Sequence, residues 1–171
     1  QLGGLNLGND SGLGADDLLD HFESRTDLWR SFDEQIERKP DLVVYLSTES
    51  GLGGGLAGKA SLVGGLADGV IDYANLYSSR SNLAVVAVDS SDRTLAHELG
   101  HLMGLSHSAR QGSDRGAFYW SRGHGVDGIF ATLMAYGSAY SNAFKVSLFS
   151  SPNYNCADLQ PCGVESNKAL S

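Results

Sequence analysis

Proline and cysteine are scarce in this sequence of 171 residues, which contains only 3 prolines and 2 cysteines. A chain of this length can bury a core of ordinary size, so two cysteines exclude a small fold that depends mainly on disulfides. The scarcity of proline excludes a proline-rich linker. Glycine is frequent, with 22 residues, and predicts many tight turns and close backbone approaches.

Positive charge and long apolar runs are also lacking. The 12 lysines and arginines are outnumbered by 20 aspartates and glutamates, which gives a formal net charge of −8. No basic stripe offsets this charge, so neither nucleic acid nor an anionic membrane is an expected partner. Apolar residues make up 42% of the chain, and the longest helical pattern is well short of a membrane span. We therefore expect a soluble, single-domain monomer.

The pattern of apolar residues predicts a mixture of helices and strands. Apolar residues recur at helical spacing over residues 15–38, and short β-branched runs at 41–47 and 82–88 predict buried strands. A second helix is expected over 92–103, followed by a loop-rich region. This order favours the α/β or α+β class.

The stretch HELGHLMGLSH, residues 97–107, contains three histidines and a glutamate. A step of about 100° per residue places His97 and His101 one turn apart on the same helix face. Gly104 can adopt a positive φ and turn the chain, which brings His107 back towards the pair. Three neutral imidazoles with an open fourth position are typical of a catalytic zinc site. Glu98 lies beside the pair, where it can reach a metal-bound water without being a ligand.

The same helix is expected to have Asp92 as its N-cap and Gly104 as its C-terminal stop. Its apolar residues fall on the side opposite the histidines, where they are expected to face the core: Leu95, Ala96, Leu99, Leu102 and Met103.

An ordinary histidine-rich amphipathic helix is the alternative to a metal site. From average composition, a bare H-E-x-x-H arises by chance in roughly one chain in 200 of this length. Adding the glycine and the third histidine lowers this to the order of one in 100,000. The longer pattern therefore favours the metal site.

H-E-x-x-H-x-x-G-x-x-H followed by a Met-turn is the signature of the metzincin clan of zinc endopeptidases. The chain resembles this signature closely, at His97, Glu98, His101, Gly104 and His107. The segment TLMAYG resembles the Met-turn, in which Met134 would form an apolar floor beneath the zinc. Tyr136, two residues after Met134, resembles a tyrosine of the astacins and serralysins. Ser108, directly after the third histidine, resembles the serine of the matrixins. The segment LFSSPNYNCADLQPCGVESNKAL is similar to the tail of bacterial reprolysin-like proteins.

The resemblance implies a metzincin-type fold of the α/β (α+β) class. Such a fold has a twisted, mostly parallel sheet, long helices, an active-site helix and a loop-rich C-terminal subdomain. It implies a single catalytic domain over residues 1–171, with an N-terminal subdomain at 1–104 and a C-terminal subdomain at 105–171. Compared with reprolysin-like domains, the chain is expected to be short at both ends.

The function implied is that of a secreted zinc-dependent endopeptidase that hydrolyses extended protein or peptide substrates by zinc-activated water. One catalytic zinc would be held by His97, His101 and His107, with Glu98 as general base. Tyr136 would donate a hydrogen bond to the oxyanion; a core aromatic is the alternative for this residue. Calcium is compatible with such a domain, but no pattern indicates it.

Two rival functions belong to other classes. The segment GGGLAGKA resembles a phosphate-binding loop, but Ala60 stands where Ser or Thr would hold magnesium. The glycines at 53, 55 and 58 fit better in an edge strand with which a substrate peptide can pair. The second rival is a zinc-holding binding module without catalysis. Glu98 argues against it, because a general base would be dispensable there.

Cys156 and Cys162 are close in sequence, and a short-loop disulfide would fit an extracellular protein whose signal and pro-segment have been removed. Two free buried thiols are the alternative. The arginines between the third histidine and the Met-turn are candidates for a pocket that prefers acidic substrate residues, with solvated surface as the alternative: Arg110, Arg115 and Arg122. His124 is expected to be a loop histidine and not a fourth ligand.

Overall fold

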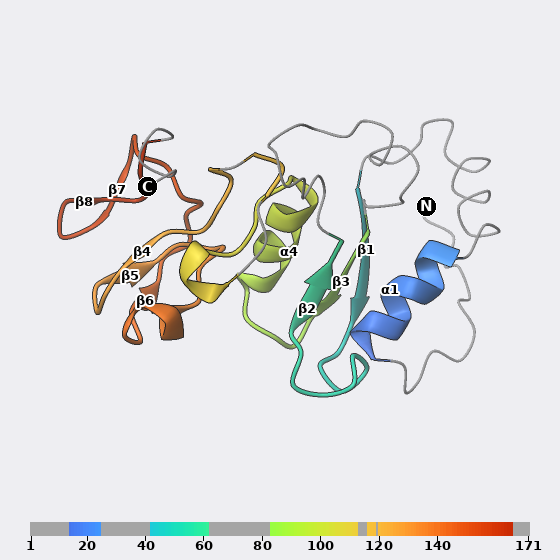
Figure 1. Cartoon of the computed structure of the whole chain (residues 1–171). Coiled ribbons are helices and arrows are strands. Elements are labelled where there is room, and N and C mark those ends of the chain that lie inside the picture. The colour runs from blue at the N-terminus through green and yellow to red at the C-terminus, as the bar shows by residue number, and fades with distance from the viewer. Residues whose placement is uncertain (1–13, 25–41, 62–82, 113–115, 119, 166–171) are drawn as a thin grey trace, which may run out of the picture.

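The computed structural model describes residues 14–24, 42–61, 83–112, 116–118 and 120–165 (Figure 1). In these ranges, no helix has the length and apolar character needed to cross a membrane.

A three-stranded sheet forms the centre of the N-terminal part. Its strands are β1 (Val43–Ser47), β2 (Gly58–Ala60) and β3 (Leu83–Ala87). The spatial order is β1-β3-β2, with β1 parallel and β2 antiparallel to β3. All five residues of β3 are buried, as expected for a central strand covered on both faces. Among the described strands, β2 is therefore an edge strand, as predicted for Gly58, whereas Gly53 and Gly55 lie in the turn before it.

Helices α1 (Ala15–Ser24) and α4 (Thr94–Leu102) cover opposite faces of this sheet (Figure 1). Alternate residues of a strand point to opposite faces, so β3 contributes to two layers. One core cluster joins the apolar side of α1 to one face of β3, through Ala15, Leu18, Leu19, Phe22, Leu83, Val85 and Ala87. The intervening Ala84 and Val86 are buried on the other face, towards α4.

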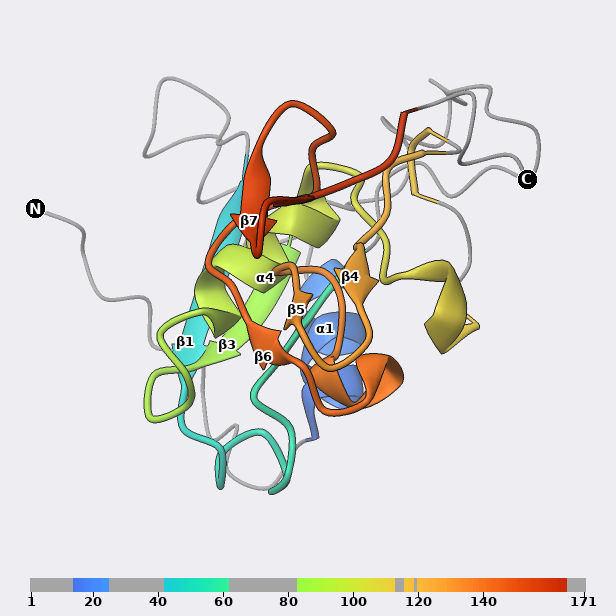
Figure 2. The same ribbon diagram turned by 90° about the vertical axis from the view of Figure 1, so that its left-hand side faces the viewer.

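The C-terminal part lies on the side of α4 away from this sheet (Figure 1, Figure 2). It contains a small sheet with the order β4-β5-β6, whose strands are β4 (Gly125–Val126), β5 (Phe130–Ala131) and β6 (Phe144–Lys145). Two 3₁₀ helices accompany it, η1 (Ala109–Gln111) and η2 (Gly137–Tyr140). Most of this region is turn and loop, in agreement with the prediction.

A hairpin of β7 (Asn155–Ala157) and β8 (Gln160–Pro161) follows. A disulfide joins Cys156 and Cys162, whose Cα atoms are 5.0 Å apart. The structure thus contains the predicted disulfide and not the two free thiols.

The mixed α and β composition is confirmed, and the two predicted strands are found with slightly shorter bounds. A twisted, mostly parallel sheet with long helices is not confirmed. In the described residues, one strand pair of the main sheet is parallel and one antiparallel, and α1 and α4 have 10 and 9 residues. The helix predicted over 15–38 is observed for its first part, and residues 25–38 lie outside the described ranges.

One prediction about α4 was wrong, and another was correct only in part. Arg93, not Asp92, occupies the N-cap, and no side chain caps this end of the helix. Of the expected core face, Leu102 is buried, but Leu95 and Met103 are 42% and 56% exposed. The buried residues of α4 are His97, Glu98, Gly100 and Leu102. The C-terminal part and β2 cover the histidine-bearing side of the helix, so that side is buried instead.

Candidate active site

The end of α4 turns the chain sharply and returns it towards the helix. Gly104 has φ +84°, which is the left-handed conformation predicted for it. Its N–H donates to the carbonyl of His101 at 2.9 Å, and the N–H of Leu105 donates to the carbonyl of Gly100 at 2.9 Å. This pair of bonds is the Schellman motif, which satisfies carbonyls left unpaired at a helix end. The turn allows the loop that carries His107 to fold back beside α4.

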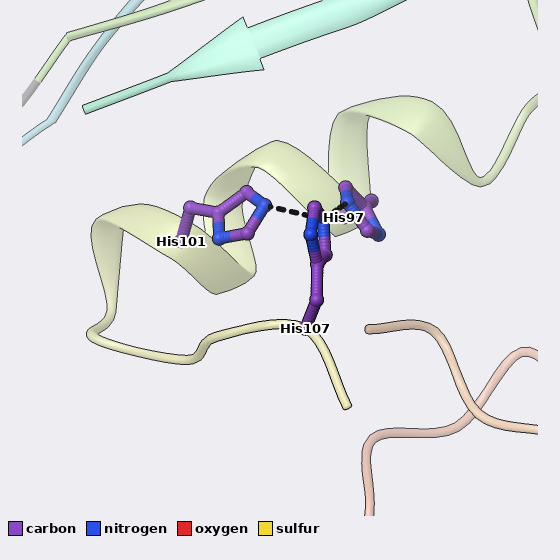
Figure 3. Close-up of side chains that lie close together, drawn as sticks. All are labelled: His97, His101 and His107. Atoms are coloured by element: carbon purple, nitrogen blue, oxygen red, sulfur yellow. Dashed lines mark hydrogen bonds between the residues drawn. The ribbon is translucent and has the colours of Figure 1, made fainter. Parts of the chain in front are cut away.

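The structure brings the three predicted ligands together (Figure 3). The Nε2 atom of His107 lies 3.0 Å from Nε2 of His97 and 3.1 Å from Nε2 of His101. One ligand atom from each residue falls within 4.8 Å of the other two. Among the described residues, this is the group of side chains with metal-binding geometry.

Backbone carbonyls fix the orientation of two of these rings. Nδ1 of His97 lies 2.6 Å from the carbonyl oxygen of Leu133, and Nδ1 of His101 lies 2.8 Å from that of Leu105. A carbonyl only accepts, so each Nδ1 carries the proton and donates it. The Nε2 atoms of these two neutral rings then carry lone pairs that face the centre of the cluster. This arrangement is usual for metal-binding histidines.

The electrostatics of the cluster favour a cation. Burial lowers the pKa of His97 and of His107 to about 4 and lowers the pKa of His101, so all three are neutral at pH 7. His107 can donate its single Nε2 proton to only one neighbour, which leaves at least one lone pair unmatched. Three nitrogens about 2.0–2.1 Å from a tetrahedral zinc would be separated by about 3.3 Å. The two separations from Nε2 of His107, 3.0 and 3.1 Å, are close to this value, so the residues fit a zinc ion.

Glu98 is 5% exposed and does not belong to the histidine cluster. Burial raises its pKa to about 7, and the nearby ammonium of Lys145 opposes that shift. The edge strand passes directly over it. A Cβ built on Gly58 would lie 2.9 Å from Cγ and 3.0 Å from Oε1 of Glu98. Glycine at this position of β2 therefore leaves room for the carboxyl group.

Tyr136 lies beside the cluster and is 46% exposed. Its ring centroid is 4.7 Å from that of His107 and 6.0 Å from that of His97. Burial, followed by the charge of Glu98, raises the pKa of its phenol. Its hydroxyl has no hydrogen-bond partner within the described parts of the chain. The alternative of a fully buried core aromatic is therefore incorrect.

Gln111 connects the loop after the third histidine to Tyr136, and no sequence motif marked it. Its Oε1 accepts hydrogen bonds from the hydroxyl of Ser108 at 2.9 Å and from the backbone N–H of Tyr136 at 2.9 Å. The capping box of η1 explains its position, because Ser108 is the N-cap and Gln111 is N3. A Ser-x-x-Gln pattern directly after His107 was the available signal.

Met134 is 1% exposed and packs against α4 at Gly100. A Cβ at Gly100 would lie 2.5 Å from Sδ of Met134 and 2.9 Å from Cε1 of Phe149. Met134 thus packs against Gly100, the residue before His101. A side chain at position 100 would displace the methionine. Both readings of the sequence made Met134 a packing residue, and its burial agrees with them.

A cavity of about 330 Å³ opens beside His97. It is lined by Gly55, Leu56, Ala57, Gly58, Ser91, Arg93, Thr94, His97, Glu98, Tyr136 and Lys145. Sequence reasoning missed Arg93 and Lys145. No motif marks them, because α4 and β6 are brought together only by tertiary packing.

Arg110 and Arg122, two of the arginines singled out from the sequence, do not line this cavity. Arg110 pairs with Asp127 at 2.6 Å on the surface. Together with Arg122 and His124, it lines a second cavity of about 390 Å³, which shares no lining residue with the first. Arg115 lies outside the described residues. His124 is likewise not part of the histidine cluster.

A sequence model of Metallo-peptidase family M12 matches residues 8–147, which is most of the chain. The chain belongs to this family. Membership of the M12 metallopeptidases confirms the resemblance to the metzincins and the predicted enzyme class, a peptide-bond hydrolase.

A peptidyl-Asp metalloendopeptidase of Pseudomonas aeruginosa strain PAO1 is 42% identical to this M12 chain over 94 residues. The match covers 47% of this chain and 16% of that relative, so the chain corresponds to a small part of the relative's length. No solved structure matches the chain.

Proposed function

We propose that the chain is a zinc-dependent endopeptidase whose catalytic centre lies between α4 and residues 132–145. The convergence of three imidazole Nε2 atoms beside a buried glutamate, in a member of a metallopeptidase family, carries this proposal. His97, His101 and His107 would hold one zinc ion. When bound, zinc would supply a Lewis acid that polarises the scissile carbonyl and makes water a nucleophile near neutral pH.

Glu98 is the general base. It accepts a proton from the attacking water and then donates that proton to the leaving amine. A carboxyl group in ordinary solvent would be a weak base at neutral pH, and burial raises the pKa of Glu98 to about 7. Its position in the same cavity as His97 supports this role.

Tyr136 acts on the oxygen of the scissile carbonyl, which gains negative charge as water attacks. Its hydroxyl donates a hydrogen bond to that oxygen. Support comes from its ring, which lies next to His107, and from a hydroxyl that the described residues leave available.

The substrate binds as an extended peptide along β2. An edge strand offers unpaired backbone groups to a peptide, which adds to the sheet as a further strand. At Gly58 the strand has no side chain, so the peptide backbone approaches Glu98 closely. The glycines of this segment therefore serve peptide binding and not a nucleotide phosphate.

Protein or peptide substrates are the expected partners, without nucleic acid or membrane, and the enzyme acts as a secreted monomer. The disulfide supports an oxidising location. The name of the Pseudomonas relative supports cleavage next to aspartate.

The fold proposed for the whole chain is metzincin-like, with a twisted, mostly parallel sheet and long helices. Its subdomains would be residues 1–104 and 105–171, with α4 and Gly104 at the boundary. The placement of the catalytic cavity between β2 and the C-terminal part supports this division.

Zinc content and Glu98→Gln together test the proposal. We expect about one zinc per chain in both proteins, because Glu98 is not a ligand. We expect Glu98→Gln to lower the kcat for peptide cleavage by at least about 100-fold, since general acid–base groups contribute about 10²–10⁴-fold. A zinc chelator should abolish wild-type cleavage. The matched control is Glu49→Gln, which changes an exposed glutamate outside the cavity.

Three outcomes would overturn parts of this proposal. Less than half an equivalent of zinc after incubation with the metal would remove the metal site. Near-native cleavage by Glu98→Gln would remove Glu98 as the base. A wild-type chain that holds zinc but cleaves no peptide in a random library would be a binding module instead.

A further inference from the structure

Two positively charged side chains line the catalytic cavity. Arg93 occupies the N-cap of α4, and Lys145 is the last residue of β6. Both side chains are partly buried. They come from different elements: Arg93 precedes His97 by one turn of helix, and Lys145 lies on a strand of the C-terminal sheet. Their meeting is therefore a property of the fold and not of a local sequence pattern.

The ammonium of Lys145 lies close to the groups proposed to act on the scissile bond. Its Nζ is 5.5 Å from the centroid of the Tyr136 ring. Its charge also acts on Glu98, whose pKa it lowers against the larger effect of burial. A substrate group that contacts Lys145 must therefore belong to a residue next to the cleaved bond, since the general base and the proposed oxyanion donor flank that bond.

Neither cation forms a salt bridge within the described parts of the chain, although Glu98 lines the same cavity and attracts Lys145. The ion pairs found there join Lys59 with Asp16 and Arg110 with Asp127, away from the cavity. Arg93 uses its Nε to donate to the hydroxyl of Ser147 at 2.9 Å. This bond orients the guanidinium but brings no negative charge. Two partly desolvated cations beside a single carboxyl group leave an excess of positive charge, which favours binding of an anion.

We propose that Lys145, with the support of Arg93, binds the acidic side chain of the substrate residue that adjoins the scissile bond. This proposal rests on the proposed endopeptidase function and names the residues that select its substrate. Lys145 is the specificity-determining contact, because it reaches the substrate carboxylate beside Glu98 and Tyr136. Arg93 adds positive charge in the same cavity. The substrate carboxylate offsets the excess positive charge of the cavity.

This arrangement selects acidic residues by charge and not by shape alone. An aspartate would form a charge-assisted hydrogen bond with the ammonium. An asparagine has the same size but no charge, so it would leave Lys145 unpaired. A lysine or arginine would place like charges together in a partly buried cavity. The expected order of preference is therefore acidic, then neutral, then basic.

The decisive experiment compares two peptides that differ only by Asp or Asn next to the cleaved bond. First, mass spectrometry of a digested peptide library identifies the position. Then kcat/KM is measured for both peptides with the wild-type chain and with Lys145→Met. We expect the Asp/Asn ratio to fall by about 10-fold or more in the variant, because the charge-assisted contact is lost. Both peptides meet the same enzyme, so any change in Glu98 cancels in the ratio.

Matched variants separate specificity from damage to the fold. Lys145→Arg keeps the charge and should keep the preference for Asp, whereas Lys145→Glu should move the preference towards a peptide with Lys at that position. Arg110→Met removes a cation outside the cavity and should leave the Asp/Asn ratio as in the wild type. If Lys145→Met fails to fold, Lys145→Gln and Arg93→Met carry the same comparison, because each removes a positive charge from the cavity.

The two proposals fail in different ways. Wild-type cleavage of both peptides at equal kcat/KM, or an unchanged ratio in Lys145→Met, would overturn the role of Lys145 while the endopeptidase stands. An equal fall for both peptides would make Lys145 a positioning residue for Glu98 and would also overturn the specificity role. Absence of cleavage by the wild type with zinc bound would instead overturn the proposed function itself.

Discussion

Tyr136 carries its hydroxyl at the edge of the histidine cluster, half-exposed and available to a substrate. In the proposed mechanism it contacts the substrate only as negative charge develops. Such an interaction lowers the barrier without strengthening ground-state binding, so its loss changes kcat and not KM.

We therefore expect Tyr136→Phe to lower kcat by roughly 10²-fold with KM nearly unchanged. Removal of one oxyanion donor costs about 2.7–4 kcal/mol in other enzymes, and less where a metal shares the charge. Steady-state kinetics on one peptide measure both constants. Zinc content and thermal midpoint should stay as in the wild type, because the ring and its packing remain. A changed thermal midpoint with normal kcat would assign Tyr136 a packing role only.

The residues of the proposed site fall into two groups by how visible they are in the sequence. His97, Glu98, His101 and His107 lie within eleven residues, and the rules of helix periodicity and of the glycine turn suffice to bring them together. Arg93 and Lys145 enter the cavity from segments far apart in the chain. Rules of local sequence carry no information about residues that meet only in the folded chain. The sequence therefore indicated the arginines near the histidine motif as candidates for the substrate pocket.

At the scale of elements, α4 depends on a close contact with the turn that contains Met134. Gly100 is buried, and its missing side chain provides the space for Sδ of Met134. An exposed helix position would gain about 1 kcal/mol from glycine to alanine. At this position the added carbon would collide with the sulfur and with Phe149, and overpacking of this kind costs about 1–3 kcal/mol.

We expect Gly100→Ala to lower the free energy of unfolding by about 1–2 kcal/mol despite the better helix propensity. Urea unfolding at saturating zinc measures it. Met134→Ala creates room, so the double variant should lose less than the sum of the two single losses. Stabilisation by Gly100→Ala, or strict additivity in the cycle, would contradict the contact.

The C-terminal end of α4 was predictable from its glycine turn, whereas its N-cap was placed one residue early. Its buried face was predictable only in part. Leu95 and Met103 have the periodicity of a core face, yet both are exposed, because the C-terminal part and β2 bury the opposite side. Which face of a helix is covered depends on the packing of distant segments, and a metal site can place its polar side inward.

At the scale of the whole molecule, the pH dependence of stability in the metal-free chain depends on His97, His107 and Glu98. Burial of these side chains favours their neutral forms. His97 and His107 have pKa values lowered to about 4 from 6.5. Between these values the unfolded chain binds more protons than the folded chain, so stability falls as the pH falls. Glu98 has the opposite sign. Its pKa is raised from 4.5 to about 7, so its contribution to stability grows as the pH falls through that range.

After a chelator has removed zinc, we expect the urea concentration at the unfolding midpoint to decrease as the pH is lowered from 6.5 to 4. The stability lost through the two histidines is larger than the stability gained through the single glutamate. In chelated Glu98→Gln the fall should be steeper, since the opposing contribution is removed. Unfolding of both proteins at several pH values provides the measurement, and the difference between them isolates Glu98. Parallel pH curves for the two proteins would show that Glu98 is not titrating from a buried position.

The segment 133–136 is held at both ends by the groups that surround the histidine cluster. The carbonyl of Leu133 accepts from His97, and the N–H of Tyr136 donates to Gln111 in the loop after His107. Ion uptake and placement of the phenol thus share one rigid span of backbone. By thermodynamic reciprocity, an inhibitor that engages the phenol must tighten zinc retention by the same factor by which zinc tightens the inhibitor. The chelator concentration that removes the ion at equilibrium therefore becomes a reporter of how the far side of the cleft is occupied.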